Sequence, residues 1–299
     1  MLAAAWASLI AVTASVSLPG TARADCLPSG PNDVTCAPPG TGGFTAGANG
    51  LHVTVQSGAT ASTTTPAAAA ITINNTSTLE NNGTISGDVN GAGVAATNAN
   101  TITNNGLITV GDGGTGIFTG DGNTVINNGT ISSGASGIGI GVNASNTVYN
   151  YGTISTGQSG TAGVQFGSTN NTFFNYGTVR ALDGLSIEAC GCSATGNTVN
   201  NYGTLDGTLQ MTPGGSVVNN YGLVTITGDD GSVGSTQHYI NGTFNQFAGG
   251  ILELRVNALG VADSLAAGTF NLAGTVRLAV RPGLYAASNT YSFIVENLT

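Results

Sequence analysis

Apolar and polar residues alternate in short runs along this chain, and glycine and asparagine separate the runs. Residues 123–131 show the pattern, Asn-Thr-Val-Ile-Asn-Asn-Gly-Thr-Ile. One apolar residue, Val125, stands four positions before the glycine, and another, Ile131, stands two positions after it. Short β-prone runs interrupted by Asn-Gly predict a strand, a tight turn and a second strand.

The same unit recurs seven times. Its glycines are Gly83, Gly106, Gly129, Gly152, Gly177, Gly203 and Gly222, with spacings of 23, 23, 23, 25, 26 and 19 residues. The apolar residues before these glycines are Leu79, Ile102, Val125, Val148, Phe173, Val199 and Val218. Those after them are Ile85, Ile108, Ile131, Ile154, Val179, Leu205 and Val224. A period of this length is typical of a solenoid, in which each turn buries its apolar face against its neighbours.

A further strand signal follows about half a period later, in Gly93-Val94, Gly116-Ile117, Gly139-Ile140 and Gly163-Val164. No intervening segment has helical periodicity or helix caps. We therefore predict an all-β fold, a pectin-lyase-like parallel β-helix with two or three strands per turn. Seven coils spaced about 4.8 Å apart give a rod of roughly 35 Å. The usual handedness of parallel crossovers favours a right-handed helix.

Asparagine occupies the position two before the glycine in every unit: Asn81, Asn104, Asn127, Asn150, Asn175, Asn201 and Asn220. Stacked in register, these amides are expected to hydrogen-bond from coil to coil as an asparagine ladder. Asparagine also tolerates the left-handed backbone that a sharp corner can require.

The position directly before the glycine is asparagine in the first three units and tyrosine in the last four. The tyrosines, Tyr151, Tyr176, Tyr202 and Tyr221, are predicted to form a stacked aromatic column. Such a column stabilises a repeat without any ligand, and we favour this structural role. The alternative is a stripe that binds sugars or a partner.

Charged residues make up only 6% of the chain, and all five basic residues are arginine. Without residues 1–24, four arginines face 14 acidic residues, a net charge of −10. An acidic chain without lysine is poorly suited to nucleic acids or anionic membranes, so no nucleic-acid partner is expected. The acidity fits a soluble rod.

Residues 1–24 have the features of a secretory signal peptide. Leu2 to Leu18 are almost all apolar or small, and Ala22-Arg23-Ala24 before Asp25 forms an A-x-A cleavage site. A positively charged start is absent, which suggests an upstream initiation codon. A single membrane helix is the alternative, but the apolar stretch is short for one. The chain is therefore expected to be exported.

Four cysteines follow this segment. Cys26 and Cys36 enclose nine residues and are predicted to form a small N-terminal disulfide loop in an exported protein. Cys190 and Cys192 form a C-x-C, with a local disulfide, a redox pair and half a metal site as alternatives. No histidine or further cysteine lies near them in sequence, which argues against zinc.

Two groups of charged residues are candidates for chemistry. Arg180, Asp183, Glu188 and Asp206 fall on neighbouring coils, where two carboxylates can serve as an acid–base pair. Scattered solubilising charge is the favoured interpretation. Asp112, Asp121, Asp229 and Asp230 lie in glycine-rich turns, where weak Ca²⁺ binding is an alternative to ordinary turn chemistry. Neither group predicts a metal or cofactor.

After residue 235 the Asn-Gly repeat gives way to a different sequence. It contains Phe-Asn-Gln at 244–246, Gly-Gly-Ile-Leu-Glu-Leu at 249–254, and Asp-Ser-Leu at 263–265. Gly-Thr-Phe-Asn-Leu-Ala-Gly-Thr-Val follows at 268–276, and Tyr-Ser-Phe-Ile at 291–294. This order resembles the junction, or autochaperone, segment of bacterial autotransporter (type V secretion) passengers. The β-helical repeats are similar to passenger coils generally.

The resemblance implies export through an outer-membrane β-barrel translocator and folding outside a Gram-negative cell. The sequence ends before such a barrel begins, so a fragment or a truncated, non-functional gene is an alternative. We expect a signal peptide at 1–24, an N-terminal capping region at 25–70, the repeat domain at 71–235, and a junction at 236–299 with a β-sandwich-like or β-helical cap. The expected function is a non-enzymatic surface scaffold for adhesion or self-association, with a polysaccharide lyase or hydrolase as the alternative.

Overall fold

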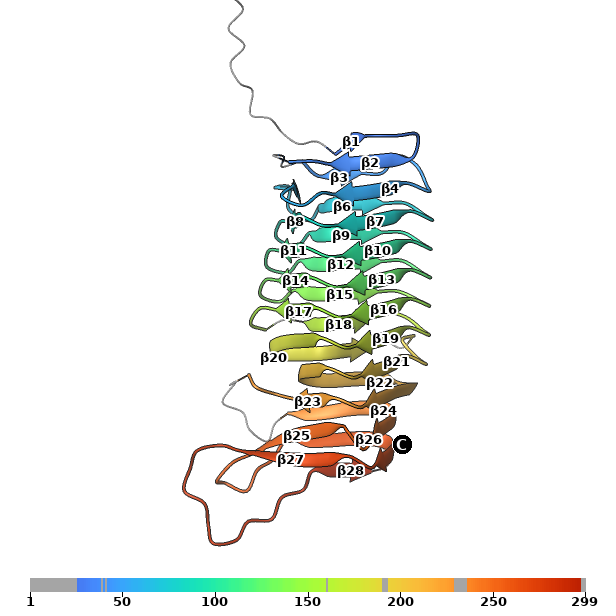
Figure 1. The fold of residues 1–299 in the computed structure, drawn as a ribbon. Helices are drawn as coiled ribbons and strands as arrows, with labels where there is room; N and C mark the ends of the chain where they lie inside the picture. The colour runs from blue at the N-terminus through green and yellow to red at the C-terminus, as the bar shows by residue number, and fades with distance from the viewer. Residues whose placement is uncertain are drawn as a thin grey trace, which may run out of the picture.

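The computed structural model describes residues 26–296, apart from 39, 41, 160, 190–192 and 229–235. The predicted signal peptide, Cys190, Cys192, Asp229 and Asp230 lie outside the described residues. Within the described part, 28 strands and no helix form a parallel β-solenoid of about ten turns (Figure 1). The predicted fold class, a parallel β-helix, is confirmed.

A regular coil contains three strands, which stack into three faces of the rod (Figure 1). Face 1 comprises β2 (Asp33–Cys36), β4 (His52–Val55), β7 (Thr78–Asn81), β10 (Thr101–Asn104), β13 (Thr124–Asn127), β16 (Thr147–Asn150), β19 (Thr172–Asn175) and β21 (Thr198–Asn201). Face 2 comprises β5 (Thr60–Ser62), β8 (Thr84–Gly87), β11 (Leu107–Val110), β14 (Thr130–Ser133) and β17 (Thr153–Thr156). Face 3 comprises β3 (Phe44–Thr45), β6 (Ala69–Ile73), β9 (Ala92–Ala96), β12 (Thr115–Thr119), β15 (Ile138–Val142) and β18 (Ala162–Phe166).

Further along the chain, single strands bend around the corners and contribute to more than one face. β20 (Thr178–Ala189) continues faces 2 and 3, and β22 (Thr204–Asn220) continues faces 2, 3 and then 1. β24 (Gln237–Gln246) and β26 (Ser264–Leu272) each continue faces 3 and 1. β23 (Leu223–Thr225), β25 (Ile251–Val256) and β27 (Thr275–Val280) belong to face 2, and β28 (Ile294–Glu296) belongs to face 3.

The coils stack in register, so each residue lies above its equivalent in the next coil. Thr101 pairs with Thr124, and Asn104 with Asn127, as neighbouring parallel strands. The apolar positions predicted to face inward, both before and after the turn glycines, are all buried. They form one continuous core along the rod, which is how a solenoid stabilises coils that are too small to fold alone.

The turn glycines are required by close contact between coils. A Cβ at Gly129 would collide with the carbonyl oxygen of Gly106, and the same holds along the column to Gly222. Neither the ladder asparagines nor these glycines have positive φ. The prediction of a left-handed backbone at this corner is therefore wrong. It occurs instead at the other two corners. Between faces 3 and 1, Gly50, Thr76, Ala99, Gly122, Ser145, Asn170 and Gly196 have φ between 56° and 68°. Between faces 2 and 3, Ala67, Asn90, Gly113, Ser136, Ser159 and Asp183 have φ between 53° and 68°.

The solenoid extends beyond the seven predicted coils at both ends. In the N-terminal region β2 and β4 already stack in register with the first strand of the repeat, with Val55 in the place of Asn81. At the other end β24 to β28 continue the parallel stack, so this segment takes the β-helical form of the two forms predicted. Apart from the exposed last coil, these coils bury the same apolar positions, but they lack Asn-Gly at the corner between faces 1 and 2.

Candidate functional site: columns along the asparagine–glycine corner

The ladder asparagines form one buried column along the rod. Nδ2 of each donates to Oδ1 of the next over 2.7–2.9 Å, from Asn81 to Asn220. Asn220 then donates to Oε1 of Gln246 at 2.8 Å. The second hydrogen of each amide is also used, as where Asn104 donates to the carbonyl oxygen of Thr130 at 3.2 Å. Because these amides are buried, their mutual hydrogen bonds offset their loss of water.

A second buried amide column, which sequence reasoning missed, lies six residues before the turn glycines. Its Oδ1 atoms accept hydrogen bonds of 2.8–2.9 Å from the backbone N–H one coil earlier. The members are Asn100, Asn123, Asn146, Asn171 and Asn197. A signal was present, since this position is asparagine in five units and serine, Ser77 or Ser216, in the other two.

The predicted tyrosines lie in one outward column on this corner. Their ring centroids are 5.0, 5.0 and 4.6 Å apart from Tyr151 to Tyr221, and neighbouring rings are within 7° of parallel. Phe247 extends the column, 4.1 Å from Tyr221. Sequence reasoning missed Phe247 because its coil has Gln246 in place of the ladder asparagine.

The stacking determines which parts of the rings are accessible. Each ring within the column covers the faces of its neighbours, so mostly ring edges meet solvent along its length. The ring face carries the π-density that a stacking ligand contacts. The sides of this column therefore offer little to a sugar, and the free ring faces are confined to its two ends.

An outward amide ladder runs beside the aromatic column on face 1. Nδ2 of Asn219 donates to Asn200 at 2.9 Å, Asn245 to Asn219 at 2.7 Å, and Asn271 to Asn245 at 2.7 Å. Earlier in the same column, Tyr149 and Phe174 stack with centroids 5.1 Å apart. This ladder was also not predicted, because its position holds other residue types, such as Tyr149 and Phe174, in the earlier coils.

The four charged candidates do not form one cluster of free groups. Nε of Arg180 lies 3.5 Å from Oδ2 of Asp206, its in-register neighbour on face 2. Asp206 also accepts hydrogen bonds from the N–H and hydroxyl of Thr227. Glu188 lies on face 3, where it accepts from Nε2 of Gln165 at 2.7 Å. Asp183 occupies the intervening corner with a φ of 56°.

The described turn aspartates link neighbouring coils. Oδ1 of Asp112 accepts from the N–H of Ala135 at 2.8 Å, and Oδ1 of Asp121 accepts from Ala144 at 3.0 Å. Turn chemistry of this kind accounts for both residues. Across the residues that the structure describes, no group of three histidine, cysteine or acidic side chains is placed to hold a metal ion.

A buried ionic cluster, unanticipated from the sequence, lies in the C-terminal coils. The Arg255 guanidinium binds Asp263 through Nε at 2.6 Å and Nη2 at 3.1 Å, and both side chains are almost fully buried. Nη1 also donates to the carbonyl of Gly228 at 3.0 Å. Nearby His238 is completely buried, and its Nδ1 accepts from the N–H of Leu209 at 3.1 Å. Burial lowers the pKa of His238 to about 4, against the opposing effect of Asp263.

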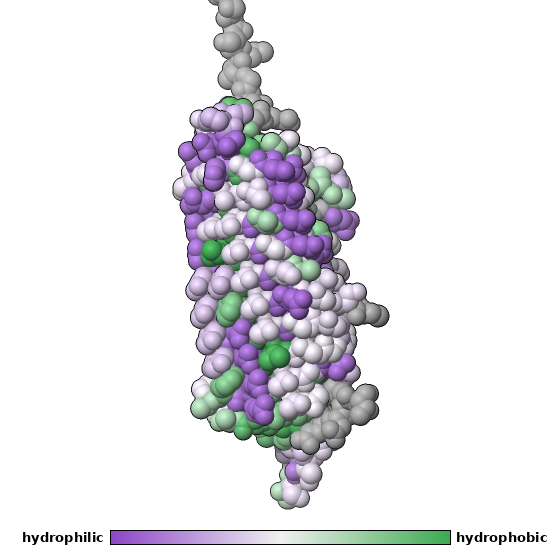
Figure 2. All heavy atoms as spheres, turned by 90° about the vertical axis from the view of Figure 1, so that its right-hand side faces the viewer, coloured by the Kyte–Doolittle hydropathy of each residue, from purple (hydrophilic) through white to green (hydrophobic). Residues whose placement is uncertain are grey.

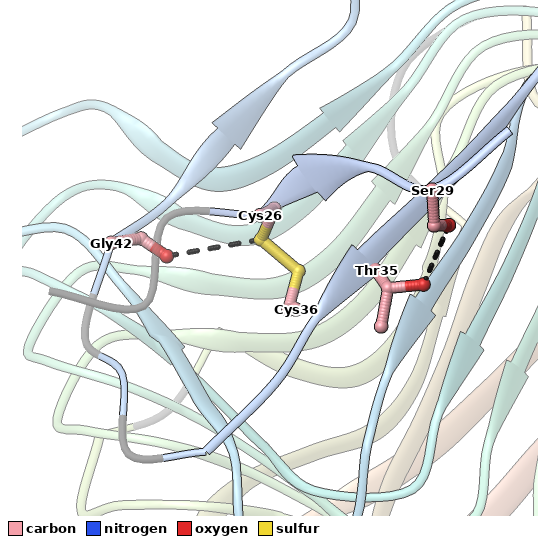
Figure 3. Close-up of a disulfide and its surroundings, with 5 residues drawn as sticks. All are labelled: Cys26, Ser29, Thr35, Cys36 and Gly42. Atoms are coloured by element: carbon pink, nitrogen blue, oxygen red, sulfur yellow. Dashed lines mark hydrogen bonds between the residues drawn. A yellow bond between two sulfur atoms is a disulfide. The ribbon is translucent and has the colours of Figure 1, made fainter.

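The N-terminal end of the rod contains a disulfide between Cys26 and Cys36, with a sequence separation of ten (Figure 3). The Ser29 and Thr35 hydroxyls lie 2.9 Å apart beside it (Figure 3). Here β1 (Leu27–Pro28) pairs antiparallel with β2, the one antiparallel strand pair among the described strands. The short strand covers the exposed edge of the first coil, as the end of a solenoid requires.

Comparison with known proteins finds no matching family model, no similar curated protein and no similar solved structure. Within the described residues, no helix has the length and apolar character needed to cross a membrane. The structure itself shows a β-helical scaffold with continuous side-chain columns.

Proposed function

We propose that this chain is an autotransporter passenger, a β-helical scaffold displayed on the surface of a Gram-negative bacterium for adhesion or self-association. The observation that carries the proposal is the in-register repetition of outward side chains. On face 1, threonines stack one above another from Thr101 to Thr198. A rod that presents the same group once per coil is suited to multivalent contact, in which many weak interactions act together.

Features at both ends support export as a passenger. Residues 1–24 resemble a signal peptide, and 236–299 resemble a junction segment. The Cys26–Cys36 disulfide joins residues only ten apart, so it ties no distant parts of the chain together during threading. An outer-membrane β-barrel translocator is the partner that this route requires.

We further propose that the role is non-enzymatic. The charged candidates Arg180, Asp206 and Glu188 are each engaged by neighbouring side chains of the scaffold. The test is a panel of polysaccharides incubated with the purified chain. Saturable lyase or hydrolase activity that disappears in Arg180→Ala would overturn the proposal and favour the enzyme.

Surface display is tested in the native host with the gene deleted and restored in tagged form. The epitope tag is inserted in the exposed segment between β27 and β28, around residue 287. Protease added to intact cells is expected to remove the tag, and restored cells are expected to settle or adhere faster than the deletion strain. The matched control lacks residues 2–24 and should retain the tag inside the cell. A tag protected in intact cells, with unchanged adhesion, would contradict the proposal.

A further inference from the structure

The aromatic column stops abruptly near the C-terminal end of the rod. Phe247 stacks on Tyr221 with one face, and in the next coil Ala273 occupies the equivalent position. A methyl group covers little of a phenyl ring, and Phe247 remains 37% exposed. The second face of Phe247 is therefore accessible, unlike the ring faces within the column.

A groove of about 500 Å³ opens at this point, lined by Asn245, Gln246, Phe247, Asn271, Leu272 and Ala273. This volume falls within the roughly 300–1,000 Å³ of small-molecule sites. Figure 2 shows hydrophobic residues gathered at the same end of the rod. The groove combines an aromatic face with amides, and none of its lining residues is charged.

The outward amide ladder ends in the same groove. Nδ2 of Asn271 donates to Asn245, but Oδ1 of Asn271 accepts no hydrogen bond from the described residues. A side-chain amide has two donor hydrogens and a carbonyl acceptor, so the last rung retains both kinds of capacity. Beside the free face of Phe247 there are thus a donor and an acceptor.

We propose that this groove binds a neutral hexopyranose, with the sugar ring stacked on Phe247 and its hydroxyls hydrogen-bonded to Asn245 and Asn271. Each sugar hydroxyl both donates and accepts, which matches the amides at the end of the ladder. The uncharged lining favours a neutral sugar over an acidic one. This inference rests on the proposed function and names the ligand class for adhesion.

The test uses saturation-transfer NMR on the purified chain with the methyl glycosides of glucose, galactose, mannose and N-acetylglucosamine. At least one is expected to bind with a millimolar Kd, typical of a single small contact. Phe247→Ala should weaken that binding about tenfold, since the ring stack is lost. Phe247→Tyr should retain it, and Asn271→Ala should weaken it severalfold.

Tyr151→Ala is the matched control, because it removes the ring at the opposite end of the same column. It should leave binding unchanged, and circular dichroism should show that every variant is folded. The proposal is overturned if no glycoside binds, if Phe247→Ala binds as the unmodified chain does, or if Tyr151→Ala loses binding equally. It is also overturned if sedimentation shows a dimer of the unmodified chain that Phe247→Ala disrupts, because a second copy would then cover the groove. None of these outcomes depends on surface display, which the protease experiment tests separately.

Discussion

At the scale of single residues, the turn glycines determine most directly how closely successive coils can stack. A glycine here is needed because another backbone lies against it, and not because of an unusual φ. The period of the sequence identified the turn glycines. It could not show why glycine is needed there, because that depends on how closely the backbones of successive coils approach each other.

Gly152→Ala is expected to lower the free energy of unfolding by about 1–3 kcal/mol, the usual range for forced overpacking. The added Cβ would collide with the carbonyl oxygen of Gly129 and must push the coils apart. Gly47→Ala is the control, because nothing lies within 4 Å of its added Cβ. Chemical denaturation checks both variants, and equal midpoints would contradict the explanation.

His238 is expected to make stability depend on pH in a defined window. Its pKa is about 4 when folded and about 6.5 when unfolded, so unfolding takes up a proton between these values. The contribution of His238 to the free energy of unfolding is therefore fully present above pH 6.5. It is lost as the pH falls toward 4, and the total loss is about 3 kcal/mol. Arg255 and Asp263 are the charged groups that act on it.

The comparison of the unmodified chain with His238→Asn isolates this effect, because asparagine preserves an acceptor for the N–H of Leu209 but does not titrate. Denaturation midpoints measured from pH 7 to pH 4 should fall less steeply in the variant. Parallel pH profiles would show that the buried histidine is not responsible.

At the scale of strands and columns, the ladder asparagines join successive coils through their side chains. Asn150 accepts from Asn127 and donates to both Asn175 and the carbonyl of Thr178. Asn150→Leu is expected to lower the free energy of unfolding by about 1–3 kcal/mol or more, because it leaves the buried hydrogen-bond partners of Asn150 unsatisfied. Asn128→Ala removes an exposed amide bonded to Asn105 and should change stability by less than about 0.5 kcal/mol. Similar losses in both variants, measured by denaturation, would count against a special role for the buried ladder.

Sequence periodicity correctly predicted the inward positions before and after the turn glycines, because burial repeats once per coil. It missed the columns whose members change residue type, such as the step from Tyr221 to Phe247. It also missed Arg255 with Asp263, since an eight-residue separation carries no periodic signal. The N-terminal coils were not predicted, and the C-terminal coils were predicted only as one of two forms, because Asn-Gly is missing at their corner between faces 1 and 2.

At the scale of the whole molecule, the two ends of the rod differ. The N-terminal edge is covered by β1, whereas the last coil exposes Val276, Leu278 and Ile294 around an apolar hollow of about 450 Å³. The C-terminal segment β24 to β28 in turn covers the open end of β22 and β23. Removing it would uncover a long strand edge and the apolar core beneath it.

We predict that deletion of residues 236–299 slows refolding and lowers solubility, because this segment nucleates the stack and covers its edge. Refolding after dilution from denaturant, followed by circular dichroism, measures the rate, and centrifugation measures solubility. Deletion of residues 26–50 is the comparison and should have a smaller effect on rate. An unchanged rate and solubility without 236–299 would show that the coils nucleate elsewhere.

From Gly83 to Gly152 the turn glycines recur every 23 residues without interruption, and each coil contacts mainly the coils immediately before and after it. Insertion or loss of one complete 23-residue unit in this stretch therefore leaves every remaining residue with the same kinds of neighbours. A gene of this kind can lengthen or shorten by unequal recombination while its product stays folded. The length of the rod is thus an inherited variable that changes in whole steps of one coil.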